Sequence, residues 1–307
     1  MLTLEWAVNI NFFFEVLIGG LLSGVMYALV AIGFVLIYKA SGVFNFAQGA
    51  MVYFAALTCV GVMDKMGVSL WIALPITVAV MILLGLSIER VVLRPLVNQP
   101  EITLFMATIG LAFFIEGLAQ LLFGAQVRKL ELPIEDVPSQ YLMDNYNILV
   151  SQFDIMAALV CGLLVTTLAL LFSKTKVGRA LRAVADDHQA ALAVGIPLQR
   201  IWAVLWAVAG LVALVAGMLW GARNGVQFAL TFVALKALPV LILGGFTSMP
   251  GAIVGGLIIG ASEKMAEVYI GPMVGGGIEG WFPYVLALLF LLVRPEGLFG
   301  EKIIRRI

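Results

Sequence analysis

Long uncharged runs alternate with short polar segments along this chain. Runs of about 18 or more apolar residues without charge are typical of membrane-spanning helices. The clearest of them are Val16–Tyr38, Ala40–Met63, Met66–Ile88, Ile155–Ser173, Ile201–Ala222 and Ala237–Ser262. The pattern predicts an all-α polytopic membrane protein.

Allowing for shorter runs, we expect helices at about residues 12–38, 43–62, 68–92, 101–123, 152–172, 201–222, 227–243, 250–270 and 281–294. Two of these are weak spans. Residues 227–243 contain Lys236 and Pro239, and Gly280–Val293 is short. The expectation is therefore about eight to nine transmembrane helices. They form a single transmembrane domain over residues 1–307, because no segment is polar enough for a separate soluble domain.

Composition narrows the function. The chain is 63% hydrophobic and 12% charged, against about 25% charged for a soluble domain. Its net charge is zero, so we expect membrane lipid but no nucleic acid as a partner. The two cysteines lie within apolar runs, and a single His leaves no metal-ligand spacing. No catalytic cluster and no phosphate-binding loop occur, which predicts no metal, no catalytic residues and no ATP hydrolysis by this chain.

The distribution of Lys and Arg predicts the orientation. With nine spans and the N-terminus outside, twelve basic residues fall on the inner side and four on the outer side. Since basic residues favour the cytoplasmic side, the N-terminus is predicted to be periplasmic and the C-terminus cytoplasmic. The acidic loop 124–151 is then external. The loop 173–200, with five of the eighteen basic residues and the only His, is then cytoplasmic.

Many of the 32 glycines lie inside the apolar runs, as at Gly19-Gly20, Gly244-Gly245, Gly251, Gly255-Gly256 and Gly260. Small residues let membrane helices approach each other closely. Helix packing is the favoured interpretation. The alternative is a set of bends that opens a passage.

Two amides interrupt the apolar pattern near the cytoplasmic start of the second helix. Asn45 suits a helix N-cap, where its side chain accepts a backbone N–H. Alternatively, Asn45 and Gln48 line the substrate passage, where amide groups can hydrogen-bond a polar solute.

Ionisable residues also occur at membrane depth, where they normally pair, reach the interface or face a watery cavity. Glu116 and Lys236 are the deeper ones and are candidates for a pair or for the substrate pathway. Glu263 and Glu267 are four residues apart and share a helical face. They lie near the outer end of their helix and could reach interfacial water.

A series of short motifs carries a family resemblance over nearly the whole length. Taken in order and with their spacing, they resemble the LivH-type permease of bacterial branched-chain amino-acid ABC importers. The motifs are Tyr27–Gly33, Asn45–Gly49, Ile88-Glu89-Arg90, Arg94-Pro95-Leu96, Gly178–Ala183, Gly195-Ile196, Gly244–Ala252 and Arg294–Gly300.

The resemblance implies a cytoplasmic coupling helix that contacts an ATPase subunit. Permeases of this kind carry a loose Glu-Ala-Ala-x-x-x-Gly pattern there. This chain has Gln189-Ala190-Ala191 and Gly195, with Gln in place of Glu. Gly195 and Pro197 would end the helix. The charges of Arg179, Arg182, Asp186 and Asp187 would orient it.

The resemblance also implies partners and cargo. A LivM-like second permease, two LivG/LivF-like ATPases and a periplasmic binding protein would complete the importer in the bacterial inner membrane. The ATPases would use ATP and Mg²⁺, and this chain would bind no cofactor. Leucine, isoleucine or valine is the expected cargo, while relatives that carry urea, amides or aromatic acids remain an alternative. A stand-alone channel or carrier and an intramembrane enzyme are less favoured.

Overall fold

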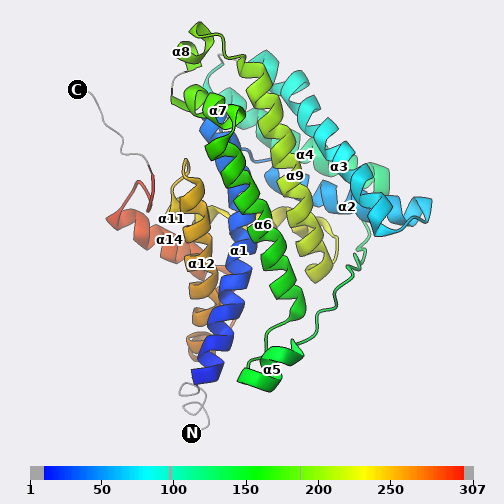
Figure 1. Cartoon of the computed structure of the whole chain (residues 1–307), viewed down its shortest axis with the longest axis vertical. Coiled ribbons are helices and arrows are strands. Elements are labelled where there is room, and N and C mark those ends of the chain that lie inside the picture. Colours follow the sequence, from blue (N-terminus) through cyan, green and yellow to red (C-terminus); the bar gives the residue numbers. More distant parts are fainter. Residues whose placement is uncertain (1–9, 97–98, 187, 301–307) are drawn as a thin grey trace. The chain divides into compact units, whose positions relative to one another are not determined.

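The computed structural model describes residues 10–96, 99–186 and 188–300 and is helical throughout these ranges, apart from loops and two isolated β-bridges. The elements are labelled in Figure 1. In chain order they are α1 (Ile10–Ser41), α2 (Gln48–Met66), α3 (Leu70–Ser87), the π-helix η2 (Ile88–Leu93), η3 (Arg94–Leu96), α4 (Glu101–Phe123), α5 (Gln140–Tyr146), α6 (Gln152–Lys174), α7 (Lys176–Asp186), α8 (His188–Ala193), α9 (Leu198–Asn224), η4 (Phe228–Phe232), α10 (Val233–Lys236), α11 (Leu238–Gly244), α12 (Met249–Tyr269), α13 (Gly271–Val274), η5 (Ile278–Gly280) and α14 (Phe282–Val293).

Within the described ranges, six helices are long and apolar enough to cross a membrane, as predicted for a polytopic all-α protein. They are Ile10–Lys39, Gln48–Met66, Leu70–Leu96, Ile102–Phe123, Gln152–Lys174 and Leu198–Asn224. A seventh span results if Phe228–Gly244 and Met249–Tyr269, which meet at a bend of 113°, count as one. The two weak segments of the sequence are the ones that fall short: residues 227–243 form a broken helix, and α14 has only 12 residues.

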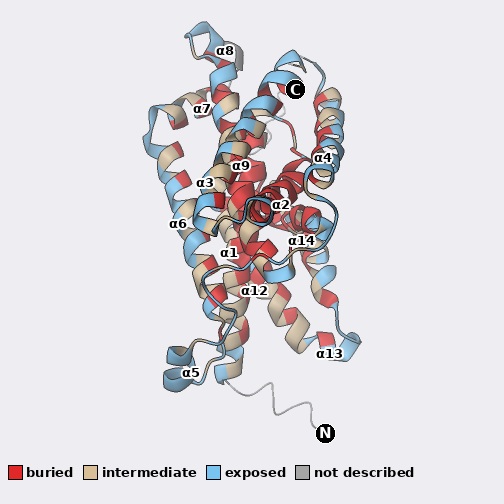
Figure 2. Ribbon diagram, turned by 90° about the vertical axis from the view of Figure 1, so that its right-hand side faces the viewer, coloured by how far each residue is buried: buried red, intermediate tan, exposed pale blue. Residues whose placement is uncertain are grey.

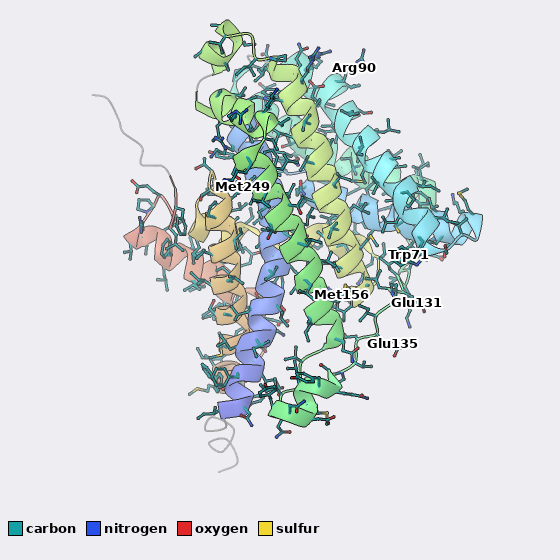
Figure 3. All side chains as sticks on the ribbon, viewed as in Figure 1. Trp71, Arg90, Glu131, Glu135, Met156 and Met249 are labelled. Atoms are coloured by element: carbon teal, nitrogen blue, oxygen red, sulfur yellow. The ribbon has the colours of Figure 1, made fainter. Side chains whose placement is uncertain are left out.

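The span Leu70–Leu96 illustrates the fit to a bilayer. Trp71 lies near one end and Arg90 near the other, and both are exposed (Figure 3). The 19 residue steps from Trp71 to Arg90 cover roughly 28 Å at the helical rise, which matches a hydrocarbon core of about 30 Å. An aromatic residue at one boundary and a basic residue at the other are typical anchors of a membrane helix.

The second helix starts later than predicted. Its first residue is Gln48 rather than residue 43. The delay has a local cause, because Gly42 adopts a positive φ of 69° and ends α1, and residues 43–47 form a turn. The predicted N-cap at Asn45 is therefore wrong, since the N-cap position is Ala47.

The contacts divide the chain into two compact units whose sequences interleave. Unit 1 comprises the described parts of residues 1–31, 133–164 and 236–307, and unit 2 comprises those of 32–132 and 165–235. The single transmembrane domain expected over residues 1–307 stays a prediction.

In unit 2 the buried helix is α2, whose residues from Gln48 to Gly61 are all buried and appear red in Figure 2. It packs against α9, α3 and α4. Glycines set the close approach: Gly217 of α9 lies against the carbonyl oxygen of Val52, and a Cβ on Gly85 of α3 would lie 2.5 Å from the Trp206 carbonyl oxygen. The packing interpretation of the glycines therefore holds at these positions.

In unit 1 the corresponding contact joins α1 and α12. Gly20 and Gly24 form one Gly-x-x-x-Gly motif, and Gly256 and Gly260 form another. A Cβ on Gly24 would lie 2.5 Å from the Gly256 carbonyl oxygen, and one on Gly20 would lie 2.8 Å from that of Gly260. The helices thus touch through their backbones, as small-residue membrane interfaces do. Gly19, by contrast, has no neighbour within 4 Å.

Candidate functional site

The two amides predicted near the second helix lie together in unit 2. Asn45 and Gln48 are both fully buried, and Asn45 Nδ2 donates a hydrogen bond of 3.1 Å to Gln48 Oε1. Asn45 Oδ1 also accepts from the backbone N–H of Ala47 at 3.1 Å. The side chain thus still satisfies a backbone donor next to the helix start, although it does so from a turn. On either side of it, Phe44 and Phe46 contact each other edge to face, with ring centroids 4.7 Å apart.

The amide nitrogen of Gln48 makes no hydrogen bond to the described residues. This Nε2 atom is buried. A Cβ on Gly33 of α1 would lie 2.5 Å from this atom, so the glycine leaves the space that the amide occupies. An unsatisfied buried donor costs about 1–3 kcal/mol. Such a cost at this position makes Gln48 a functional candidate.

In unit 1, Lys236, Glu263 and Tyr27 form a cluster of three side chains. Lys236 Nζ lies 3.3 Å from Glu263 Oε1, and the Tyr27 hydroxyl donates to the same oxygen at 3.2 Å. Lys236 also lies 5.9 Å from the centroid of the Tyr27 ring. Lys236 comes from the end of α10, Glu263 from α12 and Tyr27 from α1. Lys236 thus has a partner, as we expect for an ionisable residue that the sequence predicts at membrane depth.

Sequence reasoning placed Glu263 near interfacial water together with Glu267, and this is wrong for Glu263. Its side chain is 5% exposed and paired with Lys236. Glu267 instead accepts backbone N–H bonds from Gly277 and Glu279 and holds the loop after α13. Spacing along one helix cannot reveal this division, because the partners come from other segments.

Glu116 lies on α4 in unit 2 and is partly exposed. Among the described residues it has no ion pair or side-chain hydrogen bond. The four predicted pathway residues therefore fall into an amide pair, a cluster around Lys236 and a separate Glu116.

The predicted cytoplasmic loop folds into α7 and α8. Gly178 packs directly on the backbone of Phe172 in the last turn of α6, and Arg182 Nη1 donates to the Phe172 carbonyl oxygen at 2.6 Å. Carbonyl groups at a helix end lack partners within the helix, so Arg182 satisfies one of them. The contact ties α7 to the end of α6. Arg179 is exposed.

The end of α8 has the geometry of a Schellman motif. Gly195 has a φ of 84°, its N–H donates to the Leu192 carbonyl oxygen, and the Ile196 N–H donates to that of Ala191. Such a cap needs a residue in the left-handed region, which glycine adopts without strain. The predicted helix end at Gly195 thus has a physical basis. The side chains of Asp186, Asp187 and Gln189 lie outside the described part of the structure.

The short helix α8 exposes apolar side chains. Ala191 is buried at 3% exposure and anchors the helix, whereas Leu192 is 53% and Val194 is 76% exposed. Ala190 is exposed as well. Small and apolar side chains in the middle of a charged segment suit a contact with another protein.

Comparison with known proteins agrees with these features. The family described as branched-chain amino acid transport system / permease component matches residues 16–294. The permease protein BraD of the high-affinity branched-chain amino acid transport system from Pseudomonas aeruginosa is 30% identical over 97% of this chain and 99% of that protein. LivH of the corresponding system in Salmonella typhimurium is 28% identical over 96% and 98%.

A more distant relative and a solved structure extend the comparison. A probable branched-chain amino acid transport permease LivH from Methanocaldococcus jannaschii is 26% identical over 93% of this chain and 92% of that protein. PsaBC from Streptococcus pneumoniae in complex with Fab matches with a TM-score of 0.46 and 14% identity over 94% of this chain and 92% of that chain, which is too low to bear on function. The match over residues 16–294 and the nearly full-length agreement with BraD establish that this chain belongs to the family of permease components of branched-chain amino acid transport systems.

Proposed function

We propose that this chain is a transmembrane permease subunit of an ATP-driven importer of branched-chain amino acids. The observation that carries the proposal is the agreement with BraD and LivH over almost the whole of each chain. Both relatives are named for high-affinity branched-chain amino acid transport. The apolar helices supply the membrane-spanning body that such a subunit needs.

As a permease component, the chain is not itself an enzyme. We assign ATP and Mg²⁺ to two separate LivG/LivF-like ATPases, and we expect this chain to bind no cofactor. A LivM-like second permease and a periplasmic binding protein complete the proposed assembly. We further propose eight to nine membrane segments in the inner membrane, with a periplasmic N-terminus and a cytoplasmic C-terminus, from the distribution of basic residues.

For the contact with the ATPase we propose α8 and its surroundings. Gln189, Ala190 and Gly195 form the contact, the buried Ala191 holds α8 in place from its inner side, and Arg179, Arg182 and Asp186 orient it. The exposed Leu192 and Val194 support this assignment, as does the capped helix end at Gly195. Movement of the ATPases would reach the membrane helices through α7, which the bond from Arg182 to Phe172 ties to α6.

For the substrate pathway we propose Asn45, Gln48, Glu116 and Lys236. The buried amide pair and the ion pair between Lys236 and the buried Glu263 support the assignment, because polar groups at membrane depth are retained at a cost in stability.

Extraction of the tagged chain from membranes that contain all components tests the assembly. The expected result is co-purification of a second permease and an ATPase pair. Substituting bulky residues at both the exposed Ala190 and Gly195 should remove the ATPases and leave the second permease in place. Purification of the chain without any ATPase would contradict the proposal and favour a stand-alone carrier.

The substitution Gln48→Met distinguishes a role of Gln48 in transport from a role in the stability of the fold. Methionine has similar length and lacks the unpaired amide group, but it also removes the acceptor of the Asn45 Nδ2 hydrogen bond. The gain and the loss are each about 1–3 kcal/mol and oppose each other, so the melting temperature of the purified assembly should change little. Uptake of leucine should fall about tenfold, because the polar group is lost from the pathway. Thermal unfolding and transport assays measure the two effects.

The matched control is Thr58→Val. Thr58 lies on α2, as Gln48 does, and its Oγ1 is likewise buried without a hydrogen-bond partner among the described residues. Removing its hydroxyl should leave uptake unchanged. Equal uptake by the Gln48→Met variant and the wild type would remove Gln48 from the proposed pathway.

A further inference from the structure

The cluster of Lys236, Glu263 and Tyr27 carries an inference that goes beyond the general pathway assignment. Its two charges are held close together, with 3.3 Å between Lys236 Nζ and Glu263 Oε1. Glu263 is 5% exposed and Lys236 is 37% exposed at their side chains. The cluster is thus deeply buried on its carboxylate side and partly accessible on its ammonium side.

Stability alone does not call for this ion pair. Removing two charges from water is costly, and apolar residues of similar volume often serve a protein core at least as well. In a membrane the cost is higher still, so ionisable residues there usually serve a transported substrate or ion. Tyr27 adds a hydrogen bond to the carboxylate, which fixes the position of Glu263 Oε1.

The segment that carries Lys236 leads into a sharp bend of 113° between Phe228–Gly244 and Met249–Tyr269. Lys236 ends α10, α11 follows from Leu238, and the break lies between Gly244 at the end of α11 and Met249 at the start of α12. Interrupted helices at membrane depth occur where they line a cavity or are enclosed by protein, and transporters use them to bind substrate. Glu263 lies six residues before the end of α12, which is about 9 Å at the helical rise.

We propose that Lys236 and Glu263 receive the zwitterionic head group of the amino acid as it crosses the membrane. Lys236 would bind the α-carboxylate, and Glu263 would bind the α-ammonium group. The inference rests on the proposed function. In the observed pair each side chain already holds a group of the type that the substrate brings, since Lys236 holds a carboxylate and Glu263 holds an ammonium group.

The exchange is balanced in charge. One internal ion pair is replaced by two ion pairs with the substrate, and both the site and a zwitterion have zero net charge. No unpaired charge is left at membrane depth during passage, which avoids the cost of an isolated buried ion. The site therefore selects for a solute with both charges on one carbon and leaves the side chain of the amino acid unspecified.

A second ion pair in the same unit provides a matched control. Lys264, the next residue on α12, lies 3.9 Å from Glu279, and their side chains are 39% and 45% exposed. Solvent screens such a pair, and it contributes little. Neutralising it changes the same residue types next to the proposed site and leaves the proposed site intact.

The test uses the complete importer in proteoliposomes with Lys236→Met and Glu263→Gln combined. ATP hydrolysis stimulated by the loaded binding protein should stay within about twofold of the wild type, because the coupling segment is unchanged. Uptake of labelled leucine should fall at least tenfold. The control with Lys264→Met and Glu279→Gln should retain both activities. Wild-type uptake by the Lys236 and Glu263 variant would overturn the proposal.

A charge exchange covers the case in which the neutral variant fails to assemble. Lys236→Glu combined with Glu263→Lys keeps an ion pair, so assembly should return while uptake stays below about a tenth of the wild-type rate. Recovery of uptake together with assembly would mean that the pair is only structural. Absence of ATP-driven leucine uptake in both the wild type and the Lys264 control would contradict the proposed function itself, and the inference would fall with it.

Discussion

Gly195→Trp is expected to abolish ATP-coupled uptake and to leave the amount of the chain in the membrane unchanged. Gly195 has a φ of 84° at the end of α8, where a residue with a side chain is strained by about 1–2 kcal/mol. The indole ring would also project beside the exposed Leu192 and Val194, on the surface assigned to the ATPase. We expect uptake below a tenth of the wild-type rate, measured in proteoliposomes.

Two variants control for strain and bulk. Gly67→Trp places the same side chain at another helix end, since Gly67 follows α2 with a φ of 63° and no neighbour within 4 Å. It lies on the predicted outer side and should leave coupling intact. Gly195→Asn, which tolerates the left-handed region, should retain most of the uptake. Persistent uptake by Gly195→Trp with normally stimulated ATPases would refute the coupling assignment.

Gly24→Leu should prevent α1 and α12 from packing. A side chain at this position meets backbone atoms of Gly256 and Leu257, and backbone atoms cannot move aside as a flexible side chain can. Overpacking typically costs about 1–3 kcal/mol, and we expect a value at the upper end. The yield of monodisperse protein after detergent extraction should fall several-fold, with a lower melting temperature.

The control for this prediction lies five residues away on the same helix. Gly19→Leu adds the same side chain where nothing lies within 4 Å. Its yield and melting temperature should match those of the wild type. Equal behaviour of the two variants would mean that the close contact between Gly24 and Gly256 is not needed for folding.

Apolar runs were sufficient to predict the long helices because a membrane span must be both apolar and about 20 residues long. Thus α4 and α6 begin where the sequence predicts. The start of α2 was missed because the turn after Gly42 consists mostly of apolar residues, so the hydrophobic pattern does not mark it. The spacing that marks the end of α8, by contrast, is visible as Gly195 and Pro197.

The charged cluster shows where sequence reasoning stops. Glu263 and Lys236 are 27 residues apart, and Tyr27 is 236 residues from Glu263. Helical spacing identifies neighbours only three or four positions away. Helical spacing therefore grouped Glu263 with Glu267. In the structure, Glu263 pairs with Lys236, which precedes α11. Glu267 instead accepts a hydrogen bond from the loop after α13. The cost of an unpaired charge in a membrane indicates that Lys236 has a partner, but it does not identify that partner.

The central claim is that this chain moves amino acids only as part of an ATP-driven assembly. The most direct test reconstitutes it with the second permease, the two ATPases and the loaded binding protein, and measures labelled leucine inside the vesicles. We predict accumulation above the outside concentration with ATP and Mg²⁺, and none when ATP or the ATPases are omitted. Equilibration of leucine across vesicles that contain this chain alone, without ATP, would contradict the account.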